Sequence, residues 1–433
     1  MKNIFHPPDD IRCMKTLNKD KIKTTVQVHC LSINEKNLQG IVPLLKKYLM
    51  KIEKFKPIQL IADNKVDIYL SPELIKNWSG FPNDIQSALE KNSVTENDLK
   101  IKNIELTYEN FSAEDLLRAI LPSDKEGLSS FTKIGHIVHV NLREHLLPFK
   151  SIIGDILFDK VQGCKSIVNK VNMIDNTYRN FHMELLKGEN NMITAVKENN
   201  CTFKFDFSKV YWNSRLCTEH ERIIKKLNQQ DVLFDVFAGV GPFSIPAAKK
   251  RCVVYANDLN PESYKWLEYN AKANKISNEY FQSFNKDGAD FIKTEIKKHL
   301  PINLENEKNI FITMNLPALA VNFLANFEGL FNPDELPNIT KTPLIFLYCF
   351  VKGENYTELA KELILENFNC NDSDIIDIFR VRTVSSLKEM MRVTIKLTRE
   401  ILTTENLRKR KFEDQEDNNT KRSKDGKEQE ESR

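Results

Sequence analysis

The part of the chain that most constrains the fold is residues 225–400, where short apolar runs alternate with amphipathic stretches. Four runs have the length and composition of buried strands: Val232–Phe237, Val253–Asp258, Ile310–Asn315 and Leu344–Phe350. Helical patterns follow three of them: Phe243–Lys250, Glu262–Asn274 and Tyr356–Glu366. This alternation predicts an α/β, Rossmann-like domain with a parallel sheet and helices on both faces. The β-branched segments Ile375–Val384 and Val393–Thr398 are expected to close the sheet as an antiparallel hairpin.

The first 200 residues are less regular and predict two smaller α+β domains. Residues 1–100 mix strands such as Thr24–Leu31 with helices such as Lys36–Lys51. Residues 101–200 carry the stretch HIVHVNLREHLLPFK and strands such as Lys165–Val171. The expected order is therefore an N-terminal domain (1–100), a middle domain (101–200), the α/β domain (201–402) and a tail (403–433).

The tail is predicted to be disordered, because from Glu405 onward it has almost no apolar residues to offset the cost of ordering it. Its two basic clusters, Arg408–Lys411 and Lys421–Lys424, resemble a bipartite nuclear signal, although a solvated charged tail explains them equally well. The first fifteen residues hold one Arg and an Asp9–Asp10 pair, unlike a mitochondrial presequence. We expect a protein of cytoplasm and nucleus, with the mitochondrial matrix left open.

Composition excludes several classes of protein. The chain has 433 residues, 41% of them apolar and 28% charged, which is a globular balance. Its eight cysteines form no CxxC pair, so a zinc ribbon or disulfide framework is not expected, and no metal is predicted. The longest apolar run, Pro343–Val351, is far shorter than the roughly 20 residues that span a bilayer. The net charge of +3 identifies no partner, but residues 1–60 are basic enough for either a nucleic-acid arm or a solvated surface.

The strongest local motif is the segment DVFAGVGPF, which runs from Asp235 to Phe243 where a predicted strand turns into a helix. Gly239 and Gly241 let the backbone approach a ligand closely. Ser244 stands near the place of a third glycine that a dinucleotide fingerprint would need, and the GK[ST] of a phosphate-binding loop is absent. The turn therefore favours a ligand without phosphate, one that presents an amino acid and a nucleoside.

Acidic residues follow the next two strand positions. Asp258 ends the second strand, where its carboxylate could accept from both hydroxyls of a ribose, and Leu259 beside it could pack on a base. Asp287 and Gly288 follow a third strand, where the carboxylate could bind an adenine amine. Each acid alone is more simply a helix cap or a solvated turn. Together, in this order, they favour S-adenosylmethionine as the cofactor.

The fourth strand leads into the loop Asn315-Leu-Pro317-Ala318. Methyltransferases that act on exocyclic amines have an Asn/Asp-Pro-Pro-aromatic loop at this point, with the aromatic ring stacked on a flipped base. Here Ala318 replaces the aromatic residue, which favours a nitrogen target that is held differently. A strand-end Asn followed by a turn Pro would otherwise be unremarkable.

The segment VYWNSRLCTEHER, residues 210–222, lies just ahead of the glycine turn and is dense in acids and bases. A ring nitrogen such as guanine N1 carries a proton at neutral pH, so its methylation needs a nearby general base, which is worth about 10²–10⁴-fold. This segment supplies candidates for that base, although Ser214 or Thr218 could simply cap a helix.

These segments, with NDLNP and HVNLREHLLPFK, resemble the tRNA (guanine(37)-N1)-methyltransferase family of eukaryotes and archaea. The likeness covers about residues 100–400 by motif and residues 1–100 by position and size. It implies a class I methyltransferase domain that binds S-adenosylmethionine, a small RNA-contacting domain, and an N-terminal domain that senses the tRNA elbow.

The resemblance also implies roles for individual residues. Glu219 matches the proposed general base at N1, Arg179 a residue that hydrogen-bonds guanine O6, and Asn315 a residue that contacts both the target base and the cofactor. Substrate contacts are expected from three residues: Tyr211, Arg215 and Pro317. Cofactor contacts are expected from eight residues besides Asn315: His220, Asp235, Gly239, Gly241, Asp258, Leu259, Asp287 and Gly288.

The predicted activity is transfer of a methyl group to N1 of guanine 37 in the tRNA anticodon loop by a monomeric enzyme without membrane association. The nearest alternative is the wybutosine-pathway aminocarboxypropyltransferase, which acts on the same nucleotide with the same cofactor. A non-catalytic RNA-binding protein is a more remote alternative, and a DNA or protein methyltransferase is left open.

Overall fold

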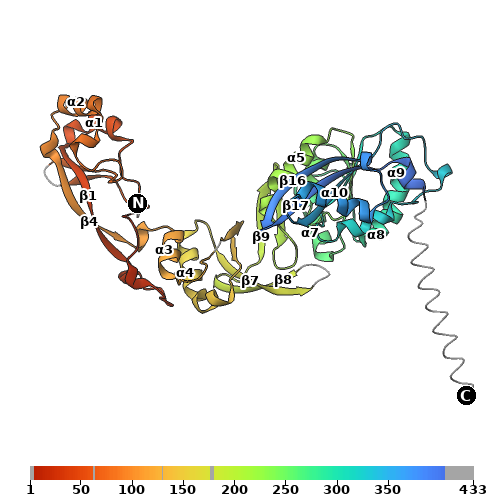
Figure 1. Ribbon diagram of the computed structural model, residues 1–433, viewed down its shortest axis with the longest axis horizontal. Coiled ribbons are helices and arrows are strands. Elements are labelled where there is room, and N and C mark those ends of the chain that lie inside the picture. Colours follow the sequence, from red (N-terminus) through yellow and green to blue (C-terminus); the bar gives the residue numbers. More distant parts are fainter. Residues whose placement is uncertain (1–3, 62–63, 129, 176–179, 405–433) are drawn as a thin grey trace, which may run out of the picture. The chain divides into compact units, whose positions relative to one another are not determined.

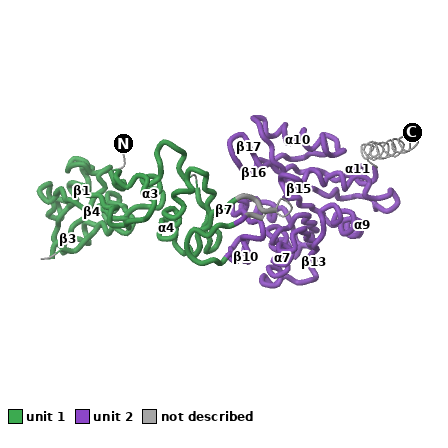
Figure 2. Tube along the Cα trace, turned by 90° about the horizontal axis from the view of Figure 1, so that it is seen from below, with its two compact units in different colours: residues 1–171, 183–191 green, residues 172–182, 192–433 purple. Residues whose placement is uncertain are grey.

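The computed structural model describes residues 4–61, 64–128, 130–175 and 180–404 (Figure 1). It divides into two compact units, which are coloured separately in Figure 2. Unit 1 comprises residues 1–171 and 183–191, and unit 2 comprises residues 172–182 and 192–433. Arg179 and the tail from Glu405 lie outside the described residues, so the predictions made for them are not addressed by the structure.

Unit 1 begins with a four-stranded antiparallel sheet in the order β2-β3-β1-β4. Its strands are β1 (Lys23–Asn34), β2 (Ile58–Ile61), β3 (Lys65–Tyr69) and β4 (Leu99–Thr107). Residues of α1 (Leu38–Leu45) and α2 (Asn83–Lys91) share a buried cluster with β1 and β3. The helix predicted over Lys36–Lys51 is shorter than expected, because Leu49 leaves it to form an antiparallel bridge with Leu70.

A second four-stranded sheet, in the order β5-β6-β7-β8, starts in unit 1. Its strands are β5 (Thr132–Ile134), β6 (Ile137–Val140), β7 (Ser166–Asp175) and β8 (Asn180–Gly188). One apolar cluster runs from Val26 of β1 through α3 (Ala113–Ile120) and α4 (Lys150–Lys160) to Ile167 of β7. The expected domain boundary at residue 100 falls inside β4, and the two predicted N-terminal domains share this core.

Unit 2 opens with the hairpin β9 (Ile193–Glu198) and β10 (Cys201–Asp206) and the helix α5 (Cys217–Lys226). A seven-stranded sheet follows in the order β13-β12-β11-β14-β15-β17-β16. Its strands are β11 (Val232–Asp235), β12 (Val253–Asn257), β13 (Phe281–Phe284), β14 (Ile310–Met314), β15 (Leu344–Lys352), β16 (Ile375–Ser385) and β17 (Lys388–Lys396). The pairs from β13 to β15 are parallel, whereas β17 is antiparallel to both of its neighbours. This confirms the Rossmann-like fold and the closing hairpin.

Helices accompany the strands of the seven-stranded sheet: α6 (Ser244–Lys249), α7 (Pro261–Ala273), α8 (Gly288–Phe291), α9 (Lys297–Glu305), α10 (Tyr356–Asn367) and α11 (Arg399–Thr403). An extensive apolar cluster lies against this sheet, with fully buried residues such as Phe234, Ile312 and Leu347. Strand order reverses at β11, since β12 and β13 lie on one side of it and β14 on the other. Such a reversal opens a crevice beyond the carboxyl ends of the strands, where ligands bind.

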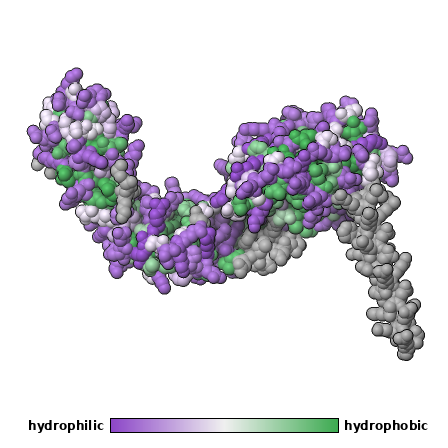
Figure 3. Space-filling view, viewed as in Figure 1, coloured by the Kyte–Doolittle hydropathy of each residue, from purple (hydrophilic) through white to green (hydrophobic). Residues whose placement is uncertain are grey.

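On the face drawn in Figure 3, hydrophilic residues cover most of the surface of each unit, and smaller apolar areas lie among these hydrophilic residues. None of the helices in the described part of the chain combines the length and the apolar character needed to cross a membrane.

Candidate cofactor and substrate site

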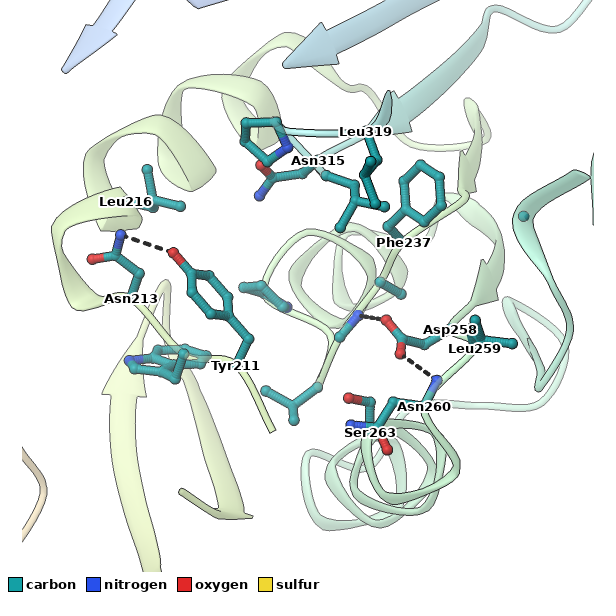
Figure 4. A pocket seen from close by; sticks show the side chains of 18 of the residues that line it. Tyr211, Asn213, Leu216, Phe237, Asp258, Leu259, Asn260, Ser263, Asn315 and Leu319 are labelled. Atoms are coloured by element: carbon teal, nitrogen blue, oxygen red, sulfur yellow. Dashed lines mark hydrogen bonds between the residues drawn. The ribbon is translucent and has the colours of Figure 1, made fainter. Parts of the chain in front are cut away.

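A cavity of about 390 Å³ lies at the strand-order reversal of unit 2 (Figure 4). Its walls come from the turns after β11, β12, β13 and β14, from the segment before α5, and from the ends of β15, β16 and β17. Nine of the predicted site residues line it: Tyr211, His220, Gly239, Asp258, Leu259, Asp287, Gly288, Asn315 and Pro317. The structure therefore brings together residues that lie more than 100 positions apart in the sequence.

The glycine turn after β11 forms one wall of the cavity. Gly239 has φ +58° and Gly241 has φ +98°, a region that residues with a Cβ rarely adopt. A Cβ at Gly239 would meet no protein atom within 4 Å, because this residue borders the cavity. Gly241 does not line the cavity, and its Cβ would collide with Ile245 and Leu267. Gly239 thus keeps the ligand space open, and Gly241 allows α6 and α7 to pack closely.

Asp258, just beyond β12, connects the glycine turn to the next loop. Its Oδ2 accepts from the backbone N–H of Gly239 at 2.8 Å, and its Oδ1 accepts from that of Asn260 at 3.0 Å (Figure 4). Burial raises the pKa of the half-buried Asp258 carboxyl to about 6, while the two backbone hydrogen bonds act in the opposite direction. The carboxylate faces the cavity and is placed to accept hydroxyl groups of a ligand.

The third strand position carries Asp287 and Gly288, at the start of α8. Oδ1 of Asp287 accepts from the backbone N–H of Ala289 at 2.8 Å, so this residue is a helix cap as well as part of the cavity wall. A Cβ at Gly288 would lie 2.8 Å from Phe237 and 3.0 Å from Phe323. These two rings meet edge to face at 5.0 Å and supply an apolar wall for a planar group.

Asp235 was predicted to bind the cofactor, but it lies beneath the glycine turn and does not line the cavity. It is completely buried, and burial raises the pKa of its carboxyl to about 7. Its Oδ1 accepts from the hydroxyl of Thr313 at 2.8 Å, and its Oδ2 accepts from that of Ser244. It therefore ties β11 to β14 and to α6, and supports the turn from behind.

His220 reaches the cavity from α5 and is held by Glu198 at the end of β9. The distance from Nδ1 of His220 to Oε1 of Glu198 is 2.6 Å, and both side chains are more than nine-tenths buried. The imidazole also packs edge to face on Phe243, 4.7 Å between ring centres. Because Glu198 occupies Nδ1, the nitrogen left to meet a ligand is Nε2.

The loop after β14 presents an unpaired acceptor. Oδ1 of Asn315 is buried and has no hydrogen-bond partner within the described part of the chain. A buried acceptor of this kind is costly unless a ligand or water completes it. The loop is anchored by Pro317, whose carbonyl accepts from the backbone N–H of Phe350 at 3.1 Å.

Two of the aromatic residues before α5 take different roles. Trp212 is buried and stacks on Phe205 with ring centres 5.0 Å apart, which fixes this segment to the β9–β10 hairpin. The ring of Tyr211 is 51% exposed and lies across the cavity from Asp258; its hydroxyl accepts from Nδ2 of Asn213 at 3.3 Å (Figure 4). Arg215 was predicted to shape the base pocket, but it is exposed and does not line the cavity.

The predicted general base, Glu219, also lies outside the cavity lining. It is 2% exposed, and its Oε1 accepts from the hydroxyl of Tyr348 at 3.0 Å and from Nη1 of Arg392 at 2.8 Å. Its Oε2 accepts from Nη1 of Arg222. Arg392 continues to Asp377 at 2.7 Å, so a buried ionic network joins α5 to the last two strands.

The network lies close behind the cavity wall. Tyr348 and Arg392 are cross-strand partners, and the next pair on the same face, Phe350 and Met390, lines the cavity. Two residues along a strand correspond to about 7 Å. Helix α5 brings Glu219 to this network and the adjacent His220 to the cavity.

Several residues of the cavity were missed at the sequence level. They are Trp212, Asn213, Leu216, Phe237, Ala238, Val240, Pro242, Asn260, Ser263, Leu316, Leu319, Phe323, Phe350, Arg382, Val384 and Met390. Many of them lie inside the quoted motifs but are apolar, and an apolar residue beside a motif residue is as easily part of the core as of a cavity wall. Arg382, Val384 and Met390 lie on the closing hairpin, for which no motif existed. Glu198 carries no signal either, since only the fold brings β9 to α5. Among the described residues, no cluster of three or more potential metal ligands occurs.

Comparison with known proteins identifies the family. A TRM5/TYW2 methyltransferase domain matches residues 194–326, and a TYW2 N-terminal domain matches residues 113–191. The tRNA (guanine(37)-N(1))-methyltransferase of Drosophila melanogaster is 46% identical over 92% of this chain and 88% of its own length. That of Xenopus tropicalis is 44% identical over 92% of this chain and 81% of its own length. The chain belongs to the tRNA (guanine(37)-N(1))-methyltransferase family.

Solved structures agree on the fold of this methyltransferase. Trm5b from Pyrococcus abyssi superimposes with a TM-score of 0.58 at 23% identity, covering 85% of this chain and 99% of that one. A complex of aTrm5 with tRNALeu gives the same TM-score at 21% identity, covering 86% of this chain and 100% of that one. Family membership also confirms S-adenosylmethionine as the cofactor and tRNA as the partner.

The cavity of the methyltransferase fits S-adenosylmethionine. The Asp258 carboxylate would hold the ribose hydroxyls, and the Phe237–Phe323 wall with Leu259 would hold the adenine. Asp287 keeps a second carboxylate oxygen, Oδ2, for the adenine amine. Nε2 of His220 and the unpaired Oδ1 of Asn315 remain for the amino-acid end of the cofactor and for the target base.

Cofactor affinity is expected to depend on pH through Asp258. The ionised carboxylate is the form that accepts from two ribose hydroxyls, so affinity is complete above the raised pKa of about 6 and is lost as the pH falls through it. Calorimetric titration of S-adenosylmethionine should give a constant Kd above pH 7 and a Kd that rises up to about tenfold per unit below pH 6. The D258N variant should bind weakly without this pH dependence. A wild-type Kd that stays flat from pH 8 to pH 5 would contradict the assignment.

Proposed function

We propose that this enzyme transfers the methyl group of S-adenosylmethionine to N1 of guanine 37 in the anticodon loop of tRNA. The observation that carries the proposal is the unpaired, buried Oδ1 of Asn315 at the wall of the cofactor cavity, in a chain of this family. An acceptor here matches the donor groups, N1–H and the N2 amine, on the Watson–Crick edge of guanine. A base in a single-stranded loop can leave the stack and enter such a cavity.

The decisive experiment uses labelled S-adenosylmethionine, purified enzyme and unmodified tRNA, followed by nuclease mapping. We expect one methyl group on the ring of guanine 37 and none on a tRNA with adenine at that position. Mass spectrometry separates this gain from the much larger group that an aminocarboxypropyltransferase would add. A label elsewhere in the tRNA, or the larger mass, would overturn the proposal.

The residues of the cavity act mainly by positioning. Bound S-adenosylmethionine supplies a methyl group on a positively charged sulfur, which any properly placed nucleophile can attack. Asn315 holds the N1 edge of guanine, and Pro317, fixed through Phe350, holds Asn315 in place. Tyr211, half-exposed at the other side of the cavity, offers a ring on which the base can stack. Arrangement of this kind can account for most of the rate acceleration.

Glu219 is the proposed acceptor of the N1 proton. Of its three donors, Arg222 is the one most open to solvent, with a side chain 36% exposed on the same helix. We propose that the Glu219 carboxylate leaves Arg222 when the tRNA is bound and turns toward the cavity side of α5, where His220 and the preceding Leu216 already lie. Tyr348 and Arg392 would keep the other oxygen in place during this turn.

The E219Q variant tests this role. Glutamine keeps an oxygen that can accept from Tyr348 and Arg392, so cofactor binding should be retained. Loss of the buried negative charge should lower the melting temperature, so the rates are compared well below it. Single-turnover methylation should fall about 10²–10⁴-fold, because no side chain then removes the N1 proton. The residual rate should rise with pH, as solvent base takes over. The E221Q variant, at an exposed position on the same helix, is the matched control.

An unchanged rate in E219Q, with unchanged cofactor affinity and a lowered melting temperature, would make Glu219 only a structural residue of the ionic network. A rate loss accompanied by loss of cofactor binding would also contradict a role confined to proton removal. The pH dependence of the residual rate separates these outcomes from a general weakening of the site.

We further propose that the enzyme acts as a monomer, needs no metal, and binds the tRNA elbow through its N-terminal region. Basic residues outnumber acidic ones in the first 60 positions, which suits contact with phosphates. Light scattering should give the mass of one chain, and a chelator should leave the methylation rate unchanged. Dimeric mass or a chelator-sensitive rate would contradict this part.

Nuclear and cytoplasmic distribution, with the mitochondrial matrix as a further compartment, is also proposed. The basic clusters Arg408–Lys411 and Lys421–Lys424 support nuclear entry. Replacing both clusters by alanine in a tagged full-length protein should shift the signal from nucleus to cytoplasm. An unchanged distribution would show that the clusters act only as a solvated tail.

A further inference from the structure

Arg382, on β16, is the one Lys or Arg side chain that lines the cavity within the described part of the chain. It is half-buried, and its Nε donates to the backbone carbonyl of Thr383 at 3.2 Å. Its two terminal nitrogens have no hydrogen-bond partner among the described residues. A guanidinium in a cavity wall with two unpaired terminal nitrogens is suited to a ligand with a matching pair of acceptors.

A β-bulge directs this side chain into the cavity. The pairing of β16 with β17 shifts between Arg380, which opposes Met391, and Arg382, which opposes Met390. If β16 paired regularly here, Arg382 would lie on the same face as Arg380, because side chains two apart in a regular strand share a face. Bulges next to sites re-aim side chains in this way.

The contacts of Arg380 show that the two faces differ. Arg380 forms an ion pair with Glu389 at 2.8 Å and lies over the ring of Tyr356 on α10, away from the cavity. Arg382 instead shares the face of Met390. The bulge within Arg380-Val381-Arg382 therefore places one arginine on each face of the sheet.

Arg382 lies in a row that ends at the Asn315 loop. It opposes Met390, Met390 opposes Phe350 on β15, and the backbone N–H of Phe350 donates to the carbonyl of Pro317 at 3.1 Å. All four residues line the cavity. The guanidinium thus belongs to the part of the wall that continues from the Asn315 loop, where the target base is proposed to lie.

We propose that Arg382 determines specificity for the target base by donating to N7 and to one lone pair of O6 of guanine; this rests on the proposed function. The second lone pair of O6 stays free for the contact that the family resemblance implies for Arg179. Arginine is a donor only, so it cannot pair with the N1–H or N2 amine of guanine. The N1 edge must face the cofactor and the acceptor of Asn315. The acceptors of guanine that remain on the neighbouring edge, O6 and N7, match the arginine fork, and this pair is the commonest specific arginine contact with a base. Adenine has a donor in place of O6 and would be rejected.

The experiment compares tRNA transcripts that carry guanine or 7-deazaguanine at position 37, using wild type, R382M and R382K. For wild type, removal of N7 should lower kcat/KM several-fold. R382M should lower kcat/KM on guanine by about five- to 150-fold, the range of one bidentate contact. On the R382M background, removal of N7 should have no further effect. R382K keeps the charge without the fork and should restore only part of the rate on guanine.

The matched control is R380M, which removes the neighbouring arginine on the opposite face and should leave the wild-type ratio between the two transcripts unchanged. Calorimetry should give R382M a Kd for S-adenosylmethionine within about twofold of wild type. Three results would overturn the inference in favour of a phosphate or cofactor contact. The first is that R382M lowers kcat/KM by the same factor on the guanine and the 7-deazaguanine transcript. The others are full rescue of the rate by R382K and a weakened Kd of R382M for S-adenosylmethionine. Absence of methylation at guanine 37 by the wild type would instead overturn the proposed function.

Discussion

The reversal of strand order at β11 is the constraint on which the site depends. Because β12 and β14 lie on opposite sides of β11, the chain leaves these strands in diverging directions, which opens a crevice beyond their carboxyl ends. The glycine turn, Asp258 and Asn315 each occupy the first positions beyond one of these strands. Their proximity therefore follows from topology, and their residue types only decide what the crevice can bind.

A buried ionic network gives the site a second support. Arg392 is 1% exposed and connects Glu219 on α5 to Asp377 on β16. In the sequence it lies 173 positions from Glu219 and 15 from Asp377. Removing one partner of such a pair costs about 3–5 kcal/mol, because the other charge is left uncompensated. The same network that orients α5 therefore restrains the proposed base. In the proposed mechanism, this carboxylate, held by three donors in the resting enzyme, exchanges Arg222 for the N1 proton.

The sequence predicted the parts of the fold and site that depend on local patterns. Alternating strands and helices, the glycine turn at Gly239 and the strand-end Asp258 and Asn315 all follow from neighbouring residues, and the structure places these residues beside the cavity. Asp235 fitted the same pattern, but a residue that ends a strand can point either into the crevice or beneath it, and here it points beneath.

Features that depend on pairing between distant strands could not be predicted. The contact of Glu198 with His220 requires β9 to reach α5, and the donors of Glu219 come from β15 and β17. The face on which Arg382 lies depends on one bulged position, which no alternation of apolar residues reveals. Arg215 was expected in the base pocket from a motif, yet its place in the first turn before α5 directs it to solvent.

These unpredicted features complete a recognition scheme that the motifs alone left partial. Guanine presents donors at N1 and N2 and acceptors at O6 and N7, and a pocket that selects it needs both kinds of partner. In the proposed scheme, Asn315 supplies the acceptor from the parallel half of the sheet, and Arg382 supplies donors from the antiparallel hairpin. The link between them, from Phe350 to Pro317, makes the spacing of the two partners a property of the sheet. An antiparallel hairpin appended to a parallel sheet can thus add base specificity to a cofactor site.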